Sequence, residues 1–101
     1  GRFVLAVVKQ YVSEHPNINL DDLEKQFPSC LSTNRKCGII RTMDFVKGRK
    51  DEGRFFTKEP IKLKDGIEVV VYSQWGNTGY LRAHFQRFLE HIRAFYSIYS
   101  R

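Results

Sequence analysis

The sequence lacks a long apolar run, and this limits where the protein can act. Its longest uninterrupted apolar stretch is residues 3–8, and both this stretch and the run at residues 69–71 are far below the roughly 20 residues that a membrane-spanning helix needs. The N-terminal apolar stretch lacks the long apolar core and the small-residue cleavage site of a signal peptide. We therefore expect a cytoplasmic protein without a membrane partner. Because the chain begins with Gly1 and not Met, we also expect a domain cut from a longer protein.

Cysteine is scarce as well. Cys30 and Cys37 are the only two, and the six residues between them match neither a C-x-x-C redox pair nor a zinc knuckle. We expect both to be reduced, structural thiols. The alternative is a disulfide that closes the loop between them.

Catalytic motifs are also missing. The sequence contains no G-x-S-x-G and no H-E-x-x-H. His84 and His91 are seven residues apart on an expected helix, about 10 Å along its axis, too far to share a metal. The acidic residues around Lys62 lack the strand arrangement of a metal-dependent nuclease. We therefore predict no catalytic residue, no metal and no cofactor, and an enzyme is the less favoured interpretation, although spatial sites can escape linear motifs.

What the sequence does contain is clustered positive charge. Ten of its seventeen Lys and Arg residues, but only four of its eleven Asp and Glu residues, fall in residues 34–64. This segment therefore carries a net charge of +6, whereas the segments before and after it carry −1 and +1. Such clustering is typical of proteins that bind a polyanion, because each cation set against a phosphate can release a counterion.

The candidate nucleic-acid-binding residues are the cations of this segment that we expect on loops and strand faces. They are Arg35, Lys36, Arg41, Lys47, Arg49, Lys50, Arg54, Lys62 and Lys64. Arg54 is the strongest candidate because a strand would hold it rigidly. Lys62 and Lys64 should share a strand face. An exposed ring of Phe55-Phe56 could stack on an unpaired base, and the alternative for the whole cluster is an ordinary solvated surface.

A second candidate site is the glycine-containing junction at residues 74–79. Here Gly76, Asn77 and Thr78 could dock a phosphate on free backbone N–H groups at the start of a helix. The spacing is not that of a P-loop, and helix capping by Asn77 or Thr78 explains the same residues without a ligand. We favour the capping interpretation.

Three amphipathic patterns predict helices. Apolar residues recur with the spacing of one helical face over residues 3–12, and this helix should end just before Pro16. Asn19 is suited to cap a second helix over residues 20–26. A third helix should follow the capping residues near position 78 and reach about residue 92.

Residues 28–36 should form a loop or one short helical turn, and glycines bound a second, exposed loop at residues 47–53. Short β-rich stretches predict strands over residues 39–43, 54–57, 61–64, 67–74 and 95–99. The pair Asp65-Gly66 supplies the positive φ angles of a type I′ turn, so the strands on either side of it should form a hairpin.

These elements predict a single α+β domain over residues 1–101, with N-terminal helices, an antiparallel sheet with a central β-hairpin, a C-terminal helix and a last strand. The size and the 42% of apolar residues suit one modest core. A winged-helix-like arrangement is compatible with this order, with the hairpin as the wing. That fold normally has a further helix before the wing, and residues 28–38 offer little to form one.

The order of several short motifs resembles a small bacterial domain associated with mobile-element and restriction-type proteins, over about residues 20–95. The motifs are Phe27-Pro28, Gly38-Ile39-Ile40-Arg41, Arg54-Phe55-Phe56, Ile61-Lys62-Leu63-Lys64-Asp65-Gly66 and Gln74-Trp75-Gly76. The resemblance implies a bacterial, DNA-handling protein. The chain differs from the pattern at Arg93-Ala94, where a Leu-Gly turn would lead into a strand.

Together these observations predict a non-enzymatic nucleic-acid-binding domain that contacts phosphates through residues 34–64, with DNA favoured over RNA. It could belong to a larger defence or mobile-element protein. The alternative is a protein-interaction module or homodimer that uses the hairpin edge or residues 95–99, because an exposed strand edge can recruit another strand.

Overall fold

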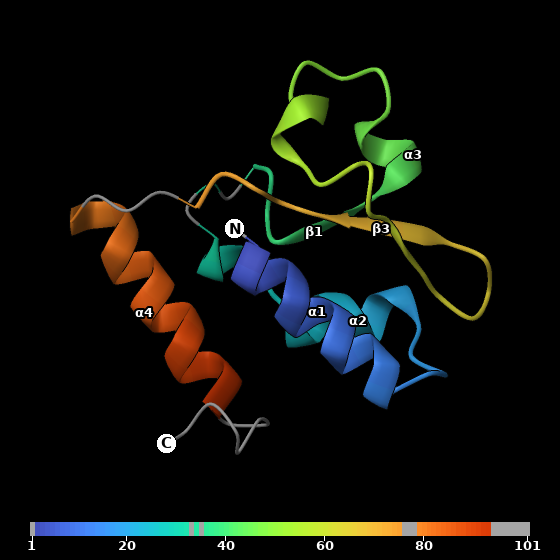
Figure 1. Cartoon of the computed structure of the whole chain (residues 1–101), viewed down its shortest axis with the longest axis horizontal. Coiled ribbons are helices and arrows are strands. Elements are labelled where there is room, and N and C mark those ends of the chain that lie inside the picture. The colour runs from blue at the N-terminus through green and yellow to red at the C-terminus, as the bar shows by residue number, and fades with distance from the viewer. Residues whose placement is uncertain (1, 33, 35, 76–78, 94–101) are drawn as a thin grey trace.

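The computed structural model describes residues 2–32, 34, 36–75 and 79–93, without the side chains of residues 79–84 (Figure 1). Within these ranges the protein combines helices with a three-stranded antiparallel sheet, which confirms the predicted α+β fold class. In chain order the elements are α1 (Arg2–Glu14), α2 (Leu20–Gln26), β1 (Ile40–Thr42), α3 (Met43–Val46), β2 (Ile61–Lys62), β3 (Glu68–Val71) and α4 (Gly79–Arg93). Two 3₁₀ turns, Ser29–Leu31 and Glu52–Arg54, lie between them.

The three strands form an antiparallel sheet in the order β1-β3-β2. Strand β3 is central, and because strand side chains alternate, it is buried on both faces. Val69 and Val71 belong to the main core with α1, α2 and α4, whereas Val70 and Tyr72 pack in a second cluster with Cys37 and other residues. The apolar run at residues 69–71 therefore belongs to a strand that is covered on two sides.

Helices α1 and α2 lie on one side of the sheet, and α3 with the loop that follows it lies on the other (Figure 1). Helix α1 buries Val4, Leu5, Val7 and Val8, in agreement with its predicted apolar face. Burial of this stripe stabilises α1, at roughly 1.5–3 kcal/mol for each large aliphatic side chain.

The cap of α2 and the packing of α4 also follow the sequence. The Asn19 side chain accepts a hydrogen bond from the Asp22 N–H at 2.8 Å, as the capping pattern predicts. In α4, Phe88 and Ile92 are fully buried, and Phe88 stacks on Phe27 with ring centres 6.3 Å apart.

The predicted strand over residues 54–57 is wrong. Arg54 ends a 3₁₀ turn, and only Phe55 forms a single bridge, to Tyr72 just after the end of β3. A strand needs a partner along its length, and β3 ends at Val71, so local β propensity was overridden.

The predicted hairpin is confirmed, with shorter strands, but its turn is not type I′. Gly66 has a positive φ of +92°, and no other residue type in the described ranges has a positive φ, so Asp65 is in an ordinary conformation. The Gly66 N–H donates to the Leu63 carbonyl at 3.0 Å, and the Leu63 N–H donates to the Ile67 carbonyl at 2.8 Å. This is the three-residue loop in which glycine occupies the left-handed position.

Helix α3 was not anticipated from the sequence. It begins directly after β1, where Thr42 Oγ1 accepts a hydrogen bond from the Phe45 N–H at 3.1 Å. Four residues are too few to reveal a helical period, so only the capping threonine signals this turn. The predicted strand over residues 95–99 lies outside the described residues. None of the described helices is both long and apolar enough to cross a bilayer.

Candidate functional site

The segment over residues 43–58, which we call the covering segment, packs on the sheet face opposite α1 and α2. Val46 and Phe55 anchor it, and both lie in the second apolar cluster with Val70. Since Arg41 pairs with Val70 in the β1–β3 register, its side chain emerges on this same face. The sheet therefore brings a strand arginine to the cations of the covering segment.

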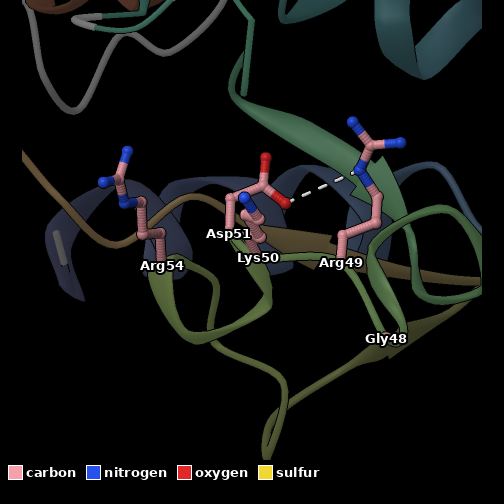
Figure 2. A pocket seen from close by; sticks show the side chains of 5 residues that line it. All are labelled: Gly48, Arg49, Lys50, Asp51 and Arg54. Carbon is pink, nitrogen blue, oxygen red and sulfur yellow. Dashed lines mark ion pairs between the residues drawn. The ribbon is translucent and has the colours of Figure 1, made fainter.

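Three of those cations line one surface hollow. Its volume is about 460 Å³, and it is formed by Gly48, Arg49, Lys50, Asp51 and Arg54. Figure 2 shows the side chains of Arg49 and Arg54 on either side of Asp51, extending to the same side of the loop. We call Arg41, Arg49, Lys50 and Arg54 the cationic cluster.

Arg41 belongs to the cluster because it lies near the same residues as the other cations. Its guanidinium carbon lies 5.5 Å from the centre of the Phe45 ring, and that of Arg49 lies 4.5 Å from the same centre. The charges of Arg54 and Arg41 both lower the pKa of the Cys37 thiol, which places them around one buried sulfur. Arg41 and Arg54, thirteen positions apart in sequence, thus come near the same sulfur only in the fold.

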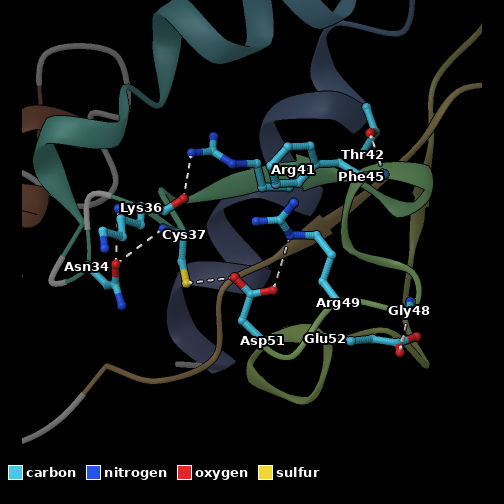
Figure 3. A network of polar contacts seen from close by, with 10 residues as sticks. All are labelled: Asn34, Lys36, Cys37, Arg41, Thr42, Phe45, Gly48, Arg49, Asp51 and Glu52. Carbon is cyan, nitrogen blue, oxygen red and sulfur yellow. Dashed lines mark hydrogen bonds and ion pairs between the residues drawn. The ribbon is translucent and has the colours of Figure 1, made fainter.

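The Arg41 side chain is held rigidly by the loop that precedes β1. Its Nη2 donates to the Lys36 carbonyl at 3.0 Å (Figure 3). Its Nη1 donates to the Ile40 carbonyl at 3.2 Å. Gly38 is required here, because a Cβ would lie 2.8 Å from Ser29 Oγ and 2.9 Å from Arg41 Nη1. Arg41 is therefore a fixed positive charge more than a mobile one.

The backbone of Arg54 is held by hydrogen bonds to Asp51 and Ser73 and not by the predicted strand. Its N–H donates to the Asp51 carbonyl at 2.9 Å, and its own carbonyl accepts from the Ser73 N–H at 2.8 Å and from Ser73 Oγ at 2.7 Å. The backbone is tied on both sides while the side chain stays exposed. The predicted strand that was to hold Arg54 is wrong, and these three hydrogen bonds hold its backbone in place of a strand.

Asp51 lies in the middle of these charges (Figure 3). Its Oδ1 is 3.6 Å from Arg49 Nε, and its Oδ2 accepts the thiol hydrogen of Cys37 at 3.7 Å. Burial raises the pKa of the Cys37 thiol, and the charge of Asp51 and this hydrogen bond raise it further. The thiol therefore stays protonated, and Asp51 neutralises part of the hollow's positive charge.

Much of the remaining positive charge of the covering segment is unpaired. In residues 43–58, Glu52 Oε1 accepts from the Gly48 N–H at 3.3 Å, and no ion pair to a described carboxylate is found for Lys47, Lys50 or Arg54. Glu59, just beyond, pairs with Arg2 and Lys9 of α1 and not with the cluster.

The other predicted cations do not join this hollow. Lys36 and Lys47 are exposed nearby, whereas Lys62 stands on β2 opposite Glu68. Lys64 lies in the hairpin turn, and its Nζ donates to Asn17 Oδ1 at 2.9 Å, in the connection between α1 and α2. The prediction that Lys62 and Lys64 share a strand face is wrong, because β2 ends at Lys62.

Other predicted site residues lie outside the described part of the chain. These are Arg35 and the phosphate-docking candidates Gly76, Asn77 and Thr78. Within the described residues, no group of three or more His, Cys, Asp or Glu side chains is arranged to hold a metal ion. Both cysteines are free thiols, with Cys30 exposed and Cys37 buried.

The aromatic residue of the site differs from the expected one. Phe55 is 5% exposed and packs on Tyr72, and Phe56 is half-buried beneath Arg2. The exposed ring among the cations is Phe45, at 45%. Phe45 could not be singled out from the sequence, because its orientation depends on the short helix α3.

No known family model, curated protein or solved structure matches this chain.

Proposed function

We propose that this domain binds nucleic acid, DNA in preference to RNA, by contacting backbone phosphates with the cationic cluster. The observation that carries the proposal is the hollow of about 460 Å³ that Arg49, Lys50 and Arg54 line together. A phosphate that enters it would meet three positive charges from one short loop. Binding would depend little on sequence, because phosphate contacts position the nucleic acid without reading its bases.

The fixed positions of the Arg41 side chain and the Arg54 backbone support this proposal. Both are held by the hydrogen bonds described above, so ordering them for phosphates would cost little further conformational entropy. Arginine suits this role because its planar guanidinium can donate two parallel hydrogen bonds to one phosphate. Lys50, which has no ion pair with a described carboxylate, adds a further charge to the lining.

The resemblance in sequence adds the expectation that the domain serves a larger bacterial defence or mobile-element protein. The alternative, strand-edge association, has less support. The outer strands β1 and β2 have only three and two residues, so they offer few backbone groups to a partner strand.

A salt titration tests the proposal. We would measure the fluorescence anisotropy of a labelled duplex of about 20 base pairs from about 50 to 200 mM salt. Three phosphate contacts predict that log K falls against log salt with a slope of about −2.7. The double variant R49E/K50E should lose most of this affinity on all sequences alike.

The matched control reverses a predicted cation that lies elsewhere. Lys64 forms its hydrogen bond with Asn17, away from the hollow, so K64E should retain nearly the wild-type salt slope. Absence of binding at low salt, or binding that salt does not weaken, would show that the proposal is wrong. A dimer in sedimentation experiments without DNA affinity would favour the interaction module.

A further inference from the structure

Phe45 is an exposed aromatic ring beside the cationic hollow. It is 45% exposed, compared with 37% for Phe3 and for Ile67, the other two exposed large apolar residues in the described part of the chain. An isolated exposed apolar residue is ordinary on a protein surface. Phe45 differs because it lies within the cationic cluster.

The local backbone holds the ring in its outward position. Thr42 Oγ1 accepts a hydrogen bond from the Phe45 N–H at 3.1 Å, and the next residue, Val46, is fully buried in the second apolar cluster. Successive residues of a helix point about 100° apart, so anchoring Val46 inward turns Phe45 outward. The orientation is therefore a consequence of the fold and not of a free side chain.

The guanidiniums of two arginines lie over the ring. The guanidinium carbon of Arg49 lies 4.5 Å and that of Arg41 lies 5.5 Å from the ring centre (Figure 3). Because Arg41 is also hydrogen-bonded to the Lys36 carbonyl, its guanidinium is held in place at the ring. The ring therefore already makes cation–π contacts with donors that suit phosphate oxygens, and a base would stack on the ring surface that remains exposed.

We propose that Phe45 is a stacking platform for an unpaired base, and that this surface therefore prefers single-stranded nucleic acid to duplex. The inference rests on the proposed function, in which the cationic cluster holds the phosphates. Every base has a π face, so the ring adds affinity without selecting a sequence. In a duplex the bases are already stacked, so the ring could contribute only if a base left the helix.

The test compares three probes of equal length, about 20 nucleotides or base pairs, which exceeds the usual span of such sites. One is a single-stranded thymidine oligomer, one is a single strand of abasic sites, and one is a duplex. Wild-type protein should bind thymidine strands more tightly than abasic strands. F45A should lose about fivefold to 150-fold on thymidine strands, the usual range for one stacked base, and should bind the other two as wild type does.

Conservative variants keep the test valid if F45A is poorly folded. F45W should retain the preference for bases, whereas F45L should lose it although its side chain is still apolar. F3A serves as a control, because Phe3 is exposed on α1 and its ring packs on Phe85, away from the cluster. It should bind all three probes as wild type does.

The outcomes separate the two proposals. If the wild type binds none of the probes, the nucleic-acid function itself is wrong. If it binds all three equally and F45A and F45L match it, phosphate binding stands and the stacking inference is overturned. Retention of base preference by F45L would also overturn stacking, because an aliphatic side chain has no π face.

Discussion

Arg41 Nη2 donates to the Lys36 carbonyl at 3.0 Å, so a strand residue fastens the loop that leads into its own strand. The contact holds the guanidinium against this loop, with its central carbon 5.5 Å from the ring centre of Phe45 in the covering segment. It also depends on a glycine, because Gly38 lies between the two residues and leaves room for the guanidinium. The position of one charge in the candidate site is therefore coupled to the stability of the loop.

The first prediction concerns that glycine. G38A should lower the free energy of unfolding by roughly 1–3 kcal/mol or more, because Gly38 has a φ of +69° and its Cβ would crowd Ser29 Oγ and Arg41 Nη1. Urea unfolding measures this directly. Gly48 has a φ of +80° but open space around it, so G48A should lower the free energy of unfolding only by the contribution of backbone strain. G53A has neither feature and should be nearly neutral, and equal effects in all three variants would contradict the prediction.

The second prediction concerns the two thiols. Iodoacetamide should alkylate the exposed Cys30 readily and Cys37 only after unfolding, because Cys37 is buried and its pKa is raised above the ordinary value of 9.0. Mass spectrometry of the intact and digested protein reports both rates. Equal rates in the native protein would show that the Cys37 environment is open.

The raised thiol pKa also predicts a dependence of stability on pH. Above the ordinary pKa of 9.0 the unfolded chain releases the Cys37 proton, whereas the folded protein still holds it. The free energy of unfolding should therefore fall as pH rises from about 9 through the folded pKa. Urea unfolding over this range, with C37A as the control that lacks the thiol, isolates the contribution of this group.

The third prediction concerns Asp51. D51N should increase affinity for nucleic acid at low salt by roughly fivefold, as expected for loss of one repulsive charge about 4 Å from a phosphate in water. It would also release Arg49 Nε from its pairing at 3.6 Å, so the salt dependence should become steeper. Anisotropy titrations of wild type and D51N, with D44N on α3 as the control, measure both. Unchanged affinity would show that the phosphates do not approach Asp51.

The fourth prediction concerns the contact between the N-terminal helix and Glu59. Arg2 donates from Nη1 at 2.9 Å and from Nη2 at 3.1 Å to the two oxygens of Glu59. These hydrogen bonds, and then the charges of Arg2 and Lys9, hold the pKa of Glu59 below its ordinary value of 4.5, although partial desolvation opposes them. A carbon-detected NMR titration should find this low pKa, and R2Q should return it toward 4.5.

The sign of its effect on stability follows from the direction of that shift. Because the folded pKa is depressed, the contribution of Glu59 is present above about pH 4.5 and is lost as pH falls through the folded pKa. The pair is largely solvent-exposed, so high salt should reduce the effect. If R2Q loses stability at low pH in the same way as the wild type, the loss comes from groups other than Glu59.

Local sequence signals were sufficient for the elements whose interactions are local. The bounds of α1 and the cap of α2 depend on residues three or four positions apart, and both were predicted from such spacings. The hairpin was predicted for the same reason, because Asp65-Gly66 is a short-range signal. Its turn type was wrong, since only one of the two residues adopts a positive φ.

The errors arise where a partner decides the outcome. Residues 54–57 include residue types that favour strands, but their neighbour β3 ends at Val71, and a 3₁₀ turn with one bridge forms in place of a strand. The short helix α3 depends on one capping threonine and on the burial of Val46 against Val70. Val46 and Val70 are too far apart in the sequence for a local pattern to reveal that they pack together.

By itself, the sequence determined the net charge of +6, its concentration in residues 34–64 and the main helices, because composition and periodicity are properties of neighbouring residues. Only the tertiary structure decided which cations share a surface. The β1–β3 register sets Arg41 on the face that the covering segment occupies, while the hairpin turn carries Lys64 to Asn17. The same packing buries Phe55 and exposes Phe45, because a side chain's burial depends on what the fold places against it.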